Sequence, residues 1–198
     1  MRTEPQKFVL LDRDGVINRV KDGGYVTSWN DFEFLPGSLP GLRLLAQNGC
    51  AVLVVSNQAC VGKGLLSAKE LRSITQRFVA EVVAFGGRIR AVYYCPHRAE
   101  AGCACRKPRA GLLRRAQLEH GFHFEETFVV GDSAGDVEAA RLVGSPAVLV
   151  SSEADTEQSA SSSGVKIVRS LYEAAEFIAA TKLDRLPTFA GQGTCVNG

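Results

Sequence analysis

The chain has 198 residues, of which 45% are hydrophobic and 22% are charged, and its net charge is +2. This composition is typical of a globular protein and excludes a disordered or fibrous chain. A charge so near neutrality gives no reason to expect nucleic acid as a partner. We expect one domain over residues 1–180, with a core that buries roughly 70% of the unfolded chain's surface. The N-terminal apolar run is too short for a signal peptide or a membrane span, so we expect a cytoplasmic protein, and a monomer.

Short apolar runs alternate with segments of helical period along the whole chain. This alternation predicts an α/β fold with a doubly wound, mostly parallel sheet. Each run is apolar throughout, as strands buried on both faces must be. The expected strands are 8–11, 51–55, 91–94, 127–130 and 147–150, with 165–168 as a candidate edge strand; the expected helices are 39–48, 67–85, 111–121, 135–143 and 171–180. Two polar or non-periodic segments, 151–164 and 181–198, are expected to be mobile.

The second expected helix has the clearest local signals. Ser67 and Glu70 have the spacing of a capping box, in which each side chain accepts a hydrogen bond from the other residue's backbone. A stripe of apolar residues at spacings of three and four follows, made of Leu71, Ile74, Phe78, Val82 and Phe85.

Polar residues follow three of the expected strands at the point where each ends. In open α/β sheets this edge binds ligands. A single aspartate after a strand is usually a turn residue, but several carboxylates at one edge repel each other unless a cation lies among them. Oxygen ligands favour Mg²⁺. The residues are Asp12 and Asp14 after the first strand, Ser56 and Asn57 after the second, and Gly131, Asp132 and Asp136 after the fourth, with Lys107 just before a helix.

This set of residue types suits phosphoryl transfer. Asp12, kept ionised by a magnesium ion shared with Asp132, would attack phosphorus and form an aspartyl-phosphate. Ser56 and Lys107 would hold the nonbridging oxygens. Asp14 would protonate the leaving alkoxide and then deprotonate the water that hydrolyses the intermediate.

The order Asp-x-Asp-Gly, Ser-Asn, Lys-Pro, Gly-Asp-x-x-x-Asp resembles the haloacid dehalogenase superfamily of phosphatases over about residues 7–150. The resemblance implies that Asp12 is the nucleophile and Asp14 the acid/base. It also implies that Mg²⁺ is bound by Asp12, by the backbone carbonyl of Asp14 and by Asp132, with Asp136 close behind. No segment long enough for a cap domain separates the first expected strand from the second, or the second from Lys107, so short loops must select the substrate.

A cysteine-dense segment, "YYCPHRAEAGCACRKP", provides a narrower resemblance, to the zinc loop of the heptose-bisphosphate and histidinol-phosphate phosphatases. Cys95, His97, Cys103 and Cys105 supply a complete tetrahedral ligand set with no open position, so the Zn²⁺ should be structural. The alternative is a surface loop with free thiols. The zinc loop, 95–105, would fix Arg106 and Lys107 over the substrate. Three further cysteines are scattered, namely Cys50, Cys60 and Cys195, and His120 and His123 are expected to be helix-end and loop residues.

Two further loops, 23–37 and 56–64, resemble the heptose-bisphosphatase branch and suggest a small phosphorylated sugar as the substrate. The resemblance implies hydrolysis of the 7-phosphate of a heptose 1,7-bisphosphate; the alternative is histidinol phosphate. A second phosphate would need its own cation, from Arg106 or Lys63. The sequence departs from the family pattern in two places. Ser133 stands where many relatives carry lysine, and Cys60 and Lys63 stand where a small residue and an arginine are expected. The expected substrate-binding residues are Tyr25, Ser56, Asn57, Gln58, Lys63, Arg106 and Lys107.

Two functions of other classes fit part of the pattern. A signalling receiver domain also places a phosphoacceptor aspartate, a hydroxyl and a lysine around Mg²⁺, but Asp14 would speed the hydrolysis that such a domain avoids. A non-catalytic zinc-organised binding module would leave the acidic residues without a purpose.

Overall fold

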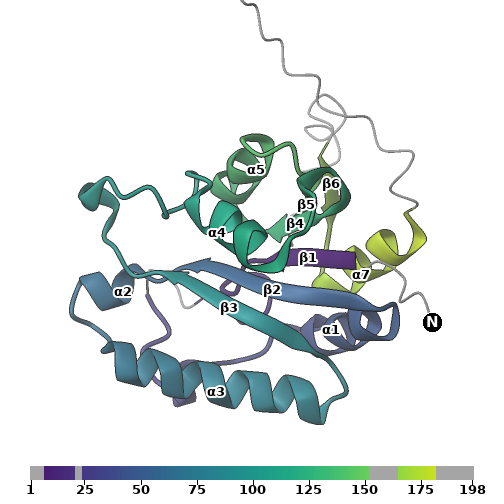
Figure 1. Cartoon of the computed structure of the whole chain (residues 1–198). Helices are drawn as coiled ribbons and strands as arrows, with labels where there is room; N and C mark the ends of the chain where they lie inside the picture. The colour runs from purple at the N-terminus through teal and green to yellow at the C-terminus, as the bar shows by residue number, and fades with distance from the viewer. Residues whose placement is uncertain (1–6, 21–23, 152–164, 182–198) are drawn as a thin grey trace, which may run out of the picture.

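The computed structural model describes residues 7–20, 24–151 and 165–181, so nearly all of the two segments expected to be mobile lies outside the described residues. Six parallel strands form one sheet in the order β3-β2-β1-β4-β5-β6 (Figure 1). The strands are β1 Lys7–Leu11, β2 Cys50–Asn57, β3 Ile89–Cys95, β4 Phe128–Gly131, β5 Ala147–Val150 and β6 Lys166–Val168. The predicted parallel sheet is confirmed, including its edge strand.

Helices cover both faces of the sheet (Figure 1). Three pack on one face, namely α1 Ser38–Gln47, α3 Ala68–Ala84 and α7 Leu171–Ala180, and two on the other, namely α4 Gly111–His120 and α5 Ala134–Arg141. Shorter pieces lie in the connections: α2 Ala59–Gly62 and the 3₁₀ turns η1 Trp29–Asp31, η2 Ala99–Ala101 and η3 Phe124–Glu126. Each of the five predicted helices is present within a few residues of its expected ends.

Strand β1 shows why the apolar runs are continuous. Val9 and Leu11 pack into the core beneath α1, α3 and α7, whereas Leu10 packs into the core beneath α4 and α5. All three side chains are fully buried. A strand between two helical layers needs apolar residues on both faces, so periodicity of two is absent.

The capping box of α3 is confirmed. The Glu70 N–H donates to Ser67 Oγ at 3.1 Å, and the Ser67 N–H donates to Glu70 Oε2 at 2.8 Å. The apolar stripe is buried from Leu71 to Val82, but Phe85, which directly follows the last helical residue, Ala84, is 43% exposed. Phe85 was therefore wrongly placed in the buried face.

The strand order places β1 at the centre, where it pairs with β2 on one side and β4 on the other. The chain moves from β1 to β2 and β3, and then returns to the far side of β1 to form β4. At such a reversal, the connections leave the carboxyl ends of neighbouring strands toward opposite faces and open a cleft between them. Among the described residues, no helix combines the length and apolarity needed to cross a bilayer.

Candidate active site

Asp12 lies at the mouth of this cleft, immediately after β1. Its N–H donates to the Val130 carbonyl at 2.8 Å, which extends the pairing of β1 with β4 by one residue. Its Oδ1 accepts a hydrogen bond from the Arg13 N–H at 2.7 Å. The side chain is only 12% exposed, so the sheet holds the carboxylate in one place while leaving it a narrow opening to the cleft.

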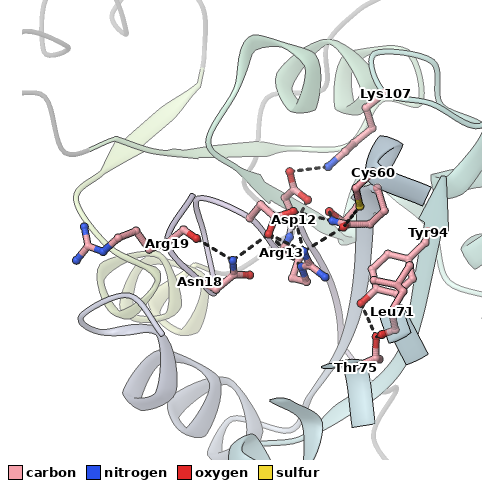
Figure 2. Close-up of polar contacts among 12 residues, drawn as sticks. Asp12, Arg13, Asn18, Arg19, Cys60, Leu71, Thr75, Tyr94 and Lys107 are labelled. Atoms are coloured by element: carbon pink, nitrogen blue, oxygen red, sulfur yellow. Dashed lines mark hydrogen bonds and ion pairs between the residues drawn. The ribbon is translucent and has the colours of Figure 1, made fainter. Parts of the chain in front are cut away.

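A buried lysine joins two of the carboxylates. Lys107 Nζ lies 3.0 Å from Asp12 Oδ2 (Figure 2). It also lies 2.5 Å from Asp136 Oδ1 and donates to the Val55 carbonyl at 2.8 Å. Burial alone would lower the pKa of Lys107, but the two carboxylates raise it above its usual value. The lysine therefore stays protonated and holds a positive charge beside Asp12.

Asn57, at the end of β2, fixes the backbone of this lysine. The Asn57 Nδ2 donates to the Lys107 carbonyl at 3.1 Å, and the Lys107 N–H donates to Asn57 Oδ1 at 3.0 Å. Both ends of the Asn57 amide are engaged in this way. The structure thus gives Asn57 a role in placing Lys107, while its predicted contact with substrate stays a prediction.

Asp132 completes a cluster of three carboxylates with Asp12 and Asp136, whose oxygen atoms lie within 4.8 Å of one another. Asp136 Oδ2 is held by the N–H and the hydroxyl of Ser133, at 3.2 and 2.5 Å. Asp132 is exposed to the cleft, yet desolvation and the charges of Asp12 and Asp136 raise its pKa to about 7. Burial also raises the pKa of Asp12, against the opposing effect of Lys107.

Three carboxylates and one ammonium leave an excess of negative charge in the cleft. A hard divalent cation bound by carboxylate oxygens would remove that excess. The donor set and its spacing therefore fit a divalent metal ion, as the sequence predicted for Asp12 and Asp132.

Two glycines make this crowding possible. A Cβ atom on Gly15 would lie 1.8 Å from Asp132 Oδ2, and Gly15 also has a φ of +81°. A Cβ atom on Gly131 would lie 2.2 Å from the Asp136 Cβ. Both glycines are therefore required by the close approach of an acidic side chain to the backbone.

Asp14 does not join the cluster of three. Its Oδ1 accepts hydrogen bonds from Arg13 and Asn18, and its Oδ2 accepts from Arg13 and Gln58. The side chain is 26% exposed, so these contacts leave part of it accessible to solvent. Its roles as acid/base and as carbonyl ligand stay predictions.

Ser56 and Gln58 are almost completely buried at the floor of the site. The Gln58 Nε2 donates to Ser56 Oγ at 3.2 Å and to Asp14 Oδ2 at 2.6 Å. A hydrogen bond between the Ser56 side chain and Asp12 lowers the pKa of Asp12, whereas burial raises it. Gln58, expected to bind substrate, thus contacts Asp14.

The four predicted zinc ligands come together at the end of β3. The sulfur atoms of Cys95, Cys103 and Cys105 lie 3.3–3.5 Å apart, and His97 Nδ1 lies 3.2 Å from Cys105 Sγ and 3.6 Å from Cys95 Sγ. A tetrahedral site with such ligands would have edges of roughly 3.5–3.8 Å. A disulfide needs sulfurs about 2.0 Å apart, and these cysteines are free. The cluster could therefore hold a metal ion.

The predicted substrate-loop residues form separate contacts. Lys63 Nζ lies 5.1 Å from the centroid of the Tyr25 ring, so these two predicted residues form a cation–π pair. Arg106 lines a pocket of about 260 Å³ together with Lys107, and its Nη1 is buried without a hydrogen-bond partner. His120 ends α4 and His123 precedes η3, as expected.

Arg13 and Asn18 are site residues that the sequence analysis missed. Both are fully buried and both contact Asp14. An arginine between two aspartates directly after a strand, together with an asparagine four residues after Asp14, was the available signal.

Comparisons with known proteins assign the class. The profile of a family described as HAD-hydrolase-like matches residues 104–174. The crystal structure of D,D-heptose 1,7-bisphosphate phosphatase from B. bronchiseptica, complexed with magnesium and phosphate, has a TM-score of 0.79 and 31% identity, over 87% of this chain and 97% of that chain. With the parallel sheet and the acidic cleft, these matches define a hydrolase of the haloacid dehalogenase class.

Curated relatives narrow the assignment. The D-glycero-beta-D-manno-heptose-1,7-bisphosphate 7-phosphatase of Pseudomonas putida is 38% identical over 144 residues, which is 73% of this chain and 82% of the relative. The D-glycero-alpha-D-manno-heptose-1,7-bisphosphate 7-phosphatase of Mycobacterium bovis is 39% identical over 150 residues, 74% of this chain and 77% of the relative. The chain belongs to this family of heptose-bisphosphate phosphatases.

The raised pKa of Asp132 leads to a prediction about cation binding. A divalent cation binds the ionised carboxylate, so protons compete with it below about pH 7, the pKa of this group. We expect the dissociation constant for Mg²⁺ to rise by up to about tenfold per pH unit below that value. Titration calorimetry between about pH 5 and pH 8 would measure it. Asp132→Asn should weaken binding and flatten the pH dependence; a constant affinity across this range would contradict the assignment.

Proposed function

We propose that this protein is a magnesium-dependent phosphatase that removes the 7-phosphate of a heptose 1,7-bisphosphate through an aspartyl-phosphate. The observation that carries this proposal is the position of Asp12, which lies at the end of β1 between the ammonium of Lys107 and the carboxylates of Asp132 and Asp136. The printed names of the relatives support the substrate.

The first half of the reaction uses Asp12 and Asp14. An oxygen of Asp12 attacks phosphorus, and the bond from phosphorus to the sugar oxygen breaks. The sugar oxygen takes the electron pair and accepts a proton from Asp14, which leaves an alcohol and an aspartyl-phosphate. Lys107 lies close enough to Asp12 to hold a nonbridging oxygen and offset its charge.

The second half returns the enzyme to its starting state. Asp14, now ionised, takes a proton from a water molecule while that water attacks phosphorus. The bond from phosphorus to Asp12 breaks, and inorganic phosphate leaves. Mg²⁺, held by Asp12, Asp132 and the carbonyl of Asp14, would supply positive charge to the phosphoryl oxygens in both halves.

The second phosphate of the substrate needs a cation away from Asp12. Arg106 suits this role because it lines the pocket that also borders Lys107. Histidinol phosphate, the alternative substrate, has one phosphate and would leave Arg106 without an anion. We therefore favour the bisphosphate.

The cysteine and histidine cluster is proposed to bind one structural Zn²⁺. The ion would hold together a loop that has little apolar content of its own, and so would order the segment that leads into Arg106 and Lys107. The loop is also tied to α2, since the Gly62 N–H donates to the Pro96 carbonyl at 2.9 Å and Arg98 Nε donates to the Gly62 carbonyl at 2.7 Å.

Location, oligomeric state and domain extent are also proposals. Each cysteine that the structure describes is free, which favours the reducing cytoplasm. The chain is proposed to form a single domain over residues 1–180 and to act as a monomer, and the near-neutral charge gives no reason to expect a nucleic-acid partner.

An assay of released phosphate tests the reaction and its substrate. With Mg²⁺ present, we expect the heptose 1,7-bisphosphate to be turned over with a higher kcat/KM than histidinol phosphate or sugar monophosphates. Asp12→Asn should abolish turnover and leave the circular dichroism spectrum unchanged, because the amide is not a nucleophile. Wild-type turnover by this variant would refute the nucleophile, and a higher kcat/KM for histidinol phosphate would refute the substrate.

Replacing Arg106 tests the site of the second phosphate. Arg106→Met should raise KM for the bisphosphate by about 10- to 100-fold, since one charge-assisted hydrogen bond is worth about 1.5–3 kcal/mol. The KM for a sugar monophosphate should change little. Arg114→Met, an exposed arginine on α4, is the matched control. Equal changes in KM for both substrates would place the second phosphate elsewhere.

Metal analysis tests the zinc site. Purified protein should contain one Zn²⁺ per chain, and Cys103→Ser should lose it, lower the midpoint of thermal unfolding and raise KM. Cys50→Ser replaces a cysteine outside the cluster and should retain the metal. If Cys103→Ser keeps wild-type stability and kinetics, the cluster does not order the loop.

A further inference from the structure

A fully buried arginine lies directly behind Asp14. Arg13 stands between the two aspartates in the sequence, but its side chain is 0% exposed, whereas those of Asp12 and Asp14 are 12% and 26% exposed. Removing a guanidinium from water costs several kcal/mol unless it is paired and hydrogen-bonded. The partners of Arg13 therefore indicate what this position is for.

The guanidinium of Arg13 forms hydrogen bonds with both oxygens of the Asp14 carboxylate. Arg13 Nε donates to Asp14 Oδ1 at 3.1 Å, and Arg13 Nη2 lies 2.8 Å from Oδ1 and 3.0 Å from Oδ2. Contacts from two nitrogens fix the plane of a carboxylate as well as its position. A lysine at this place would supply charge but not this orientation.

Gln58 ties the two groups together. Its Nε2 donates to Asp14 Oδ2 at 2.6 Å, and its Oε1 accepts from Arg13 Nη2 at 3.0 Å. Asn18 Nδ2 adds a hydrogen bond to Asp14 Oδ1 at 2.9 Å. The carboxylate is thus held by three side chains, from the turn after β1 and from the end of β2.

Arg13 also packs against a tyrosine of β3, and a threonine of α3 forms a hydrogen bond with that tyrosine. Its guanidinium carbon lies 5.7 Å from the centroid of the Tyr94 ring on β3 (Figure 2). Tyr94 Oη lies 2.8 Å from Thr75 Oγ1 on α3, and Thr75 Oγ1 donates to the Leu71 carbonyl at 2.7 Å. Since Thr75 has one hydroxyl proton, Tyr94 is the donor to it. The Tyr94 ring against which Arg13 packs is therefore held in place by its hydrogen bond to Thr75.

We propose that Arg13 is a positioning residue for the proton transfers of Asp14: with Gln58, it holds the carboxylate at the one orientation from which Asp14 reaches the leaving-group oxygen and then the attacking water. This rests on the proposed function only in that Asp14 is the acid/base of a phosphatase; it does not depend on which sugar is bound. The competing explanation is that Arg13 and Asp14 form an ion pair that only stabilises the fold.

Two aryl phosphates separate these explanations without the natural substrate. Phenolate is a stronger base than p-nitrophenolate, so its departure depends more on a proton from Asp14. Arg13→Lys should therefore lower kcat/KM for phenyl phosphate about tenfold or more, and for p-nitrophenyl phosphate less than about threefold, with KM nearly unchanged. A variant that is damaged in its fold would lose activity equally on both esters.

A double-mutant cycle with Asp14→Asn gives an independent readout. If Arg13 acts through Asp14, then Arg13→Lys should cause no further loss on phenyl phosphate once Asp14 is an asparagine. Arg115→Lys is the matched control, because Arg115 also pairs with a carboxylate, that of Glu119, but on the exposed surface of α4. It should leave both esters unaffected.

Gln58→Leu covers the case in which Arg13→Lys does not fold. This variant keeps the buried guanidinium and removes the bridge, and it should show the same preference for the better leaving group. Equal losses on both esters, or a loss that persists in the Asp14→Asn background, would overturn the proposal. Neither aryl phosphate contains a sugar, so turnover of these esters by the wild-type enzyme does not test the proposed heptose specificity. The two proposals are therefore judged separately.

Discussion

A single buried ammonium group holds the catalytic end of the sheet together. Lys107 carries a positive charge to the point where β1, β2 and β4 end, and it contacts Asp12, Asp136 and the Val55 carbonyl at once. Without it, two partly or fully buried carboxylates would face each other with no compensation, at a free-energy penalty of several kcal/mol for each. Neighbouring residues keep this lysine in place. Asn57 forms two hydrogen bonds with its backbone, and Cys105, the last residue of the cysteine and histidine cluster, precedes it by two positions.

The arrangement divides the acidic residues by their surroundings. Asp12 and Asp132 keep exposed edges in the cleft, where their charges need a cation. Asp136 is buried against Lys107 and Ser133, and serves to fix the lysine. Asp14 is turned toward Arg13 and Gln58. Carboxylates of the same chemical type thus suit the different roles proposed for them, metal binding, support and proton transfer, because the sheet and its loops give each one different neighbours.

Much of the fold followed from the sequence, since short apolar runs such as 8–11 and 51–55, which alternate with segments of helical period, favour strands buried on both faces. The residues that follow those runs were predicted to lie together, because the carboxyl ends of parallel strands meet at one edge of the sheet. What the sequence could not reveal was the direction of each side chain. Asn57 and Gln58 were both expected to face substrate, yet one holds Lys107 and the other holds Asp14. Arg13 was overlooked because an arginine between two aspartates is usually solvated, and only the surrounding packing shows that it is buried.

Gly15 and Gly131 show how little freedom this edge leaves for change. Neither has a side chain that could take part in a reaction, yet a single methyl group at either position would occupy the space of an aspartate. In a survey of all substitutions, these two positions should be as intolerant as Asp12, the proposed nucleophile. Intolerance to mutation at this edge therefore marks backbone that must lie against a carboxylate, as well as the side chains that perform the chemistry.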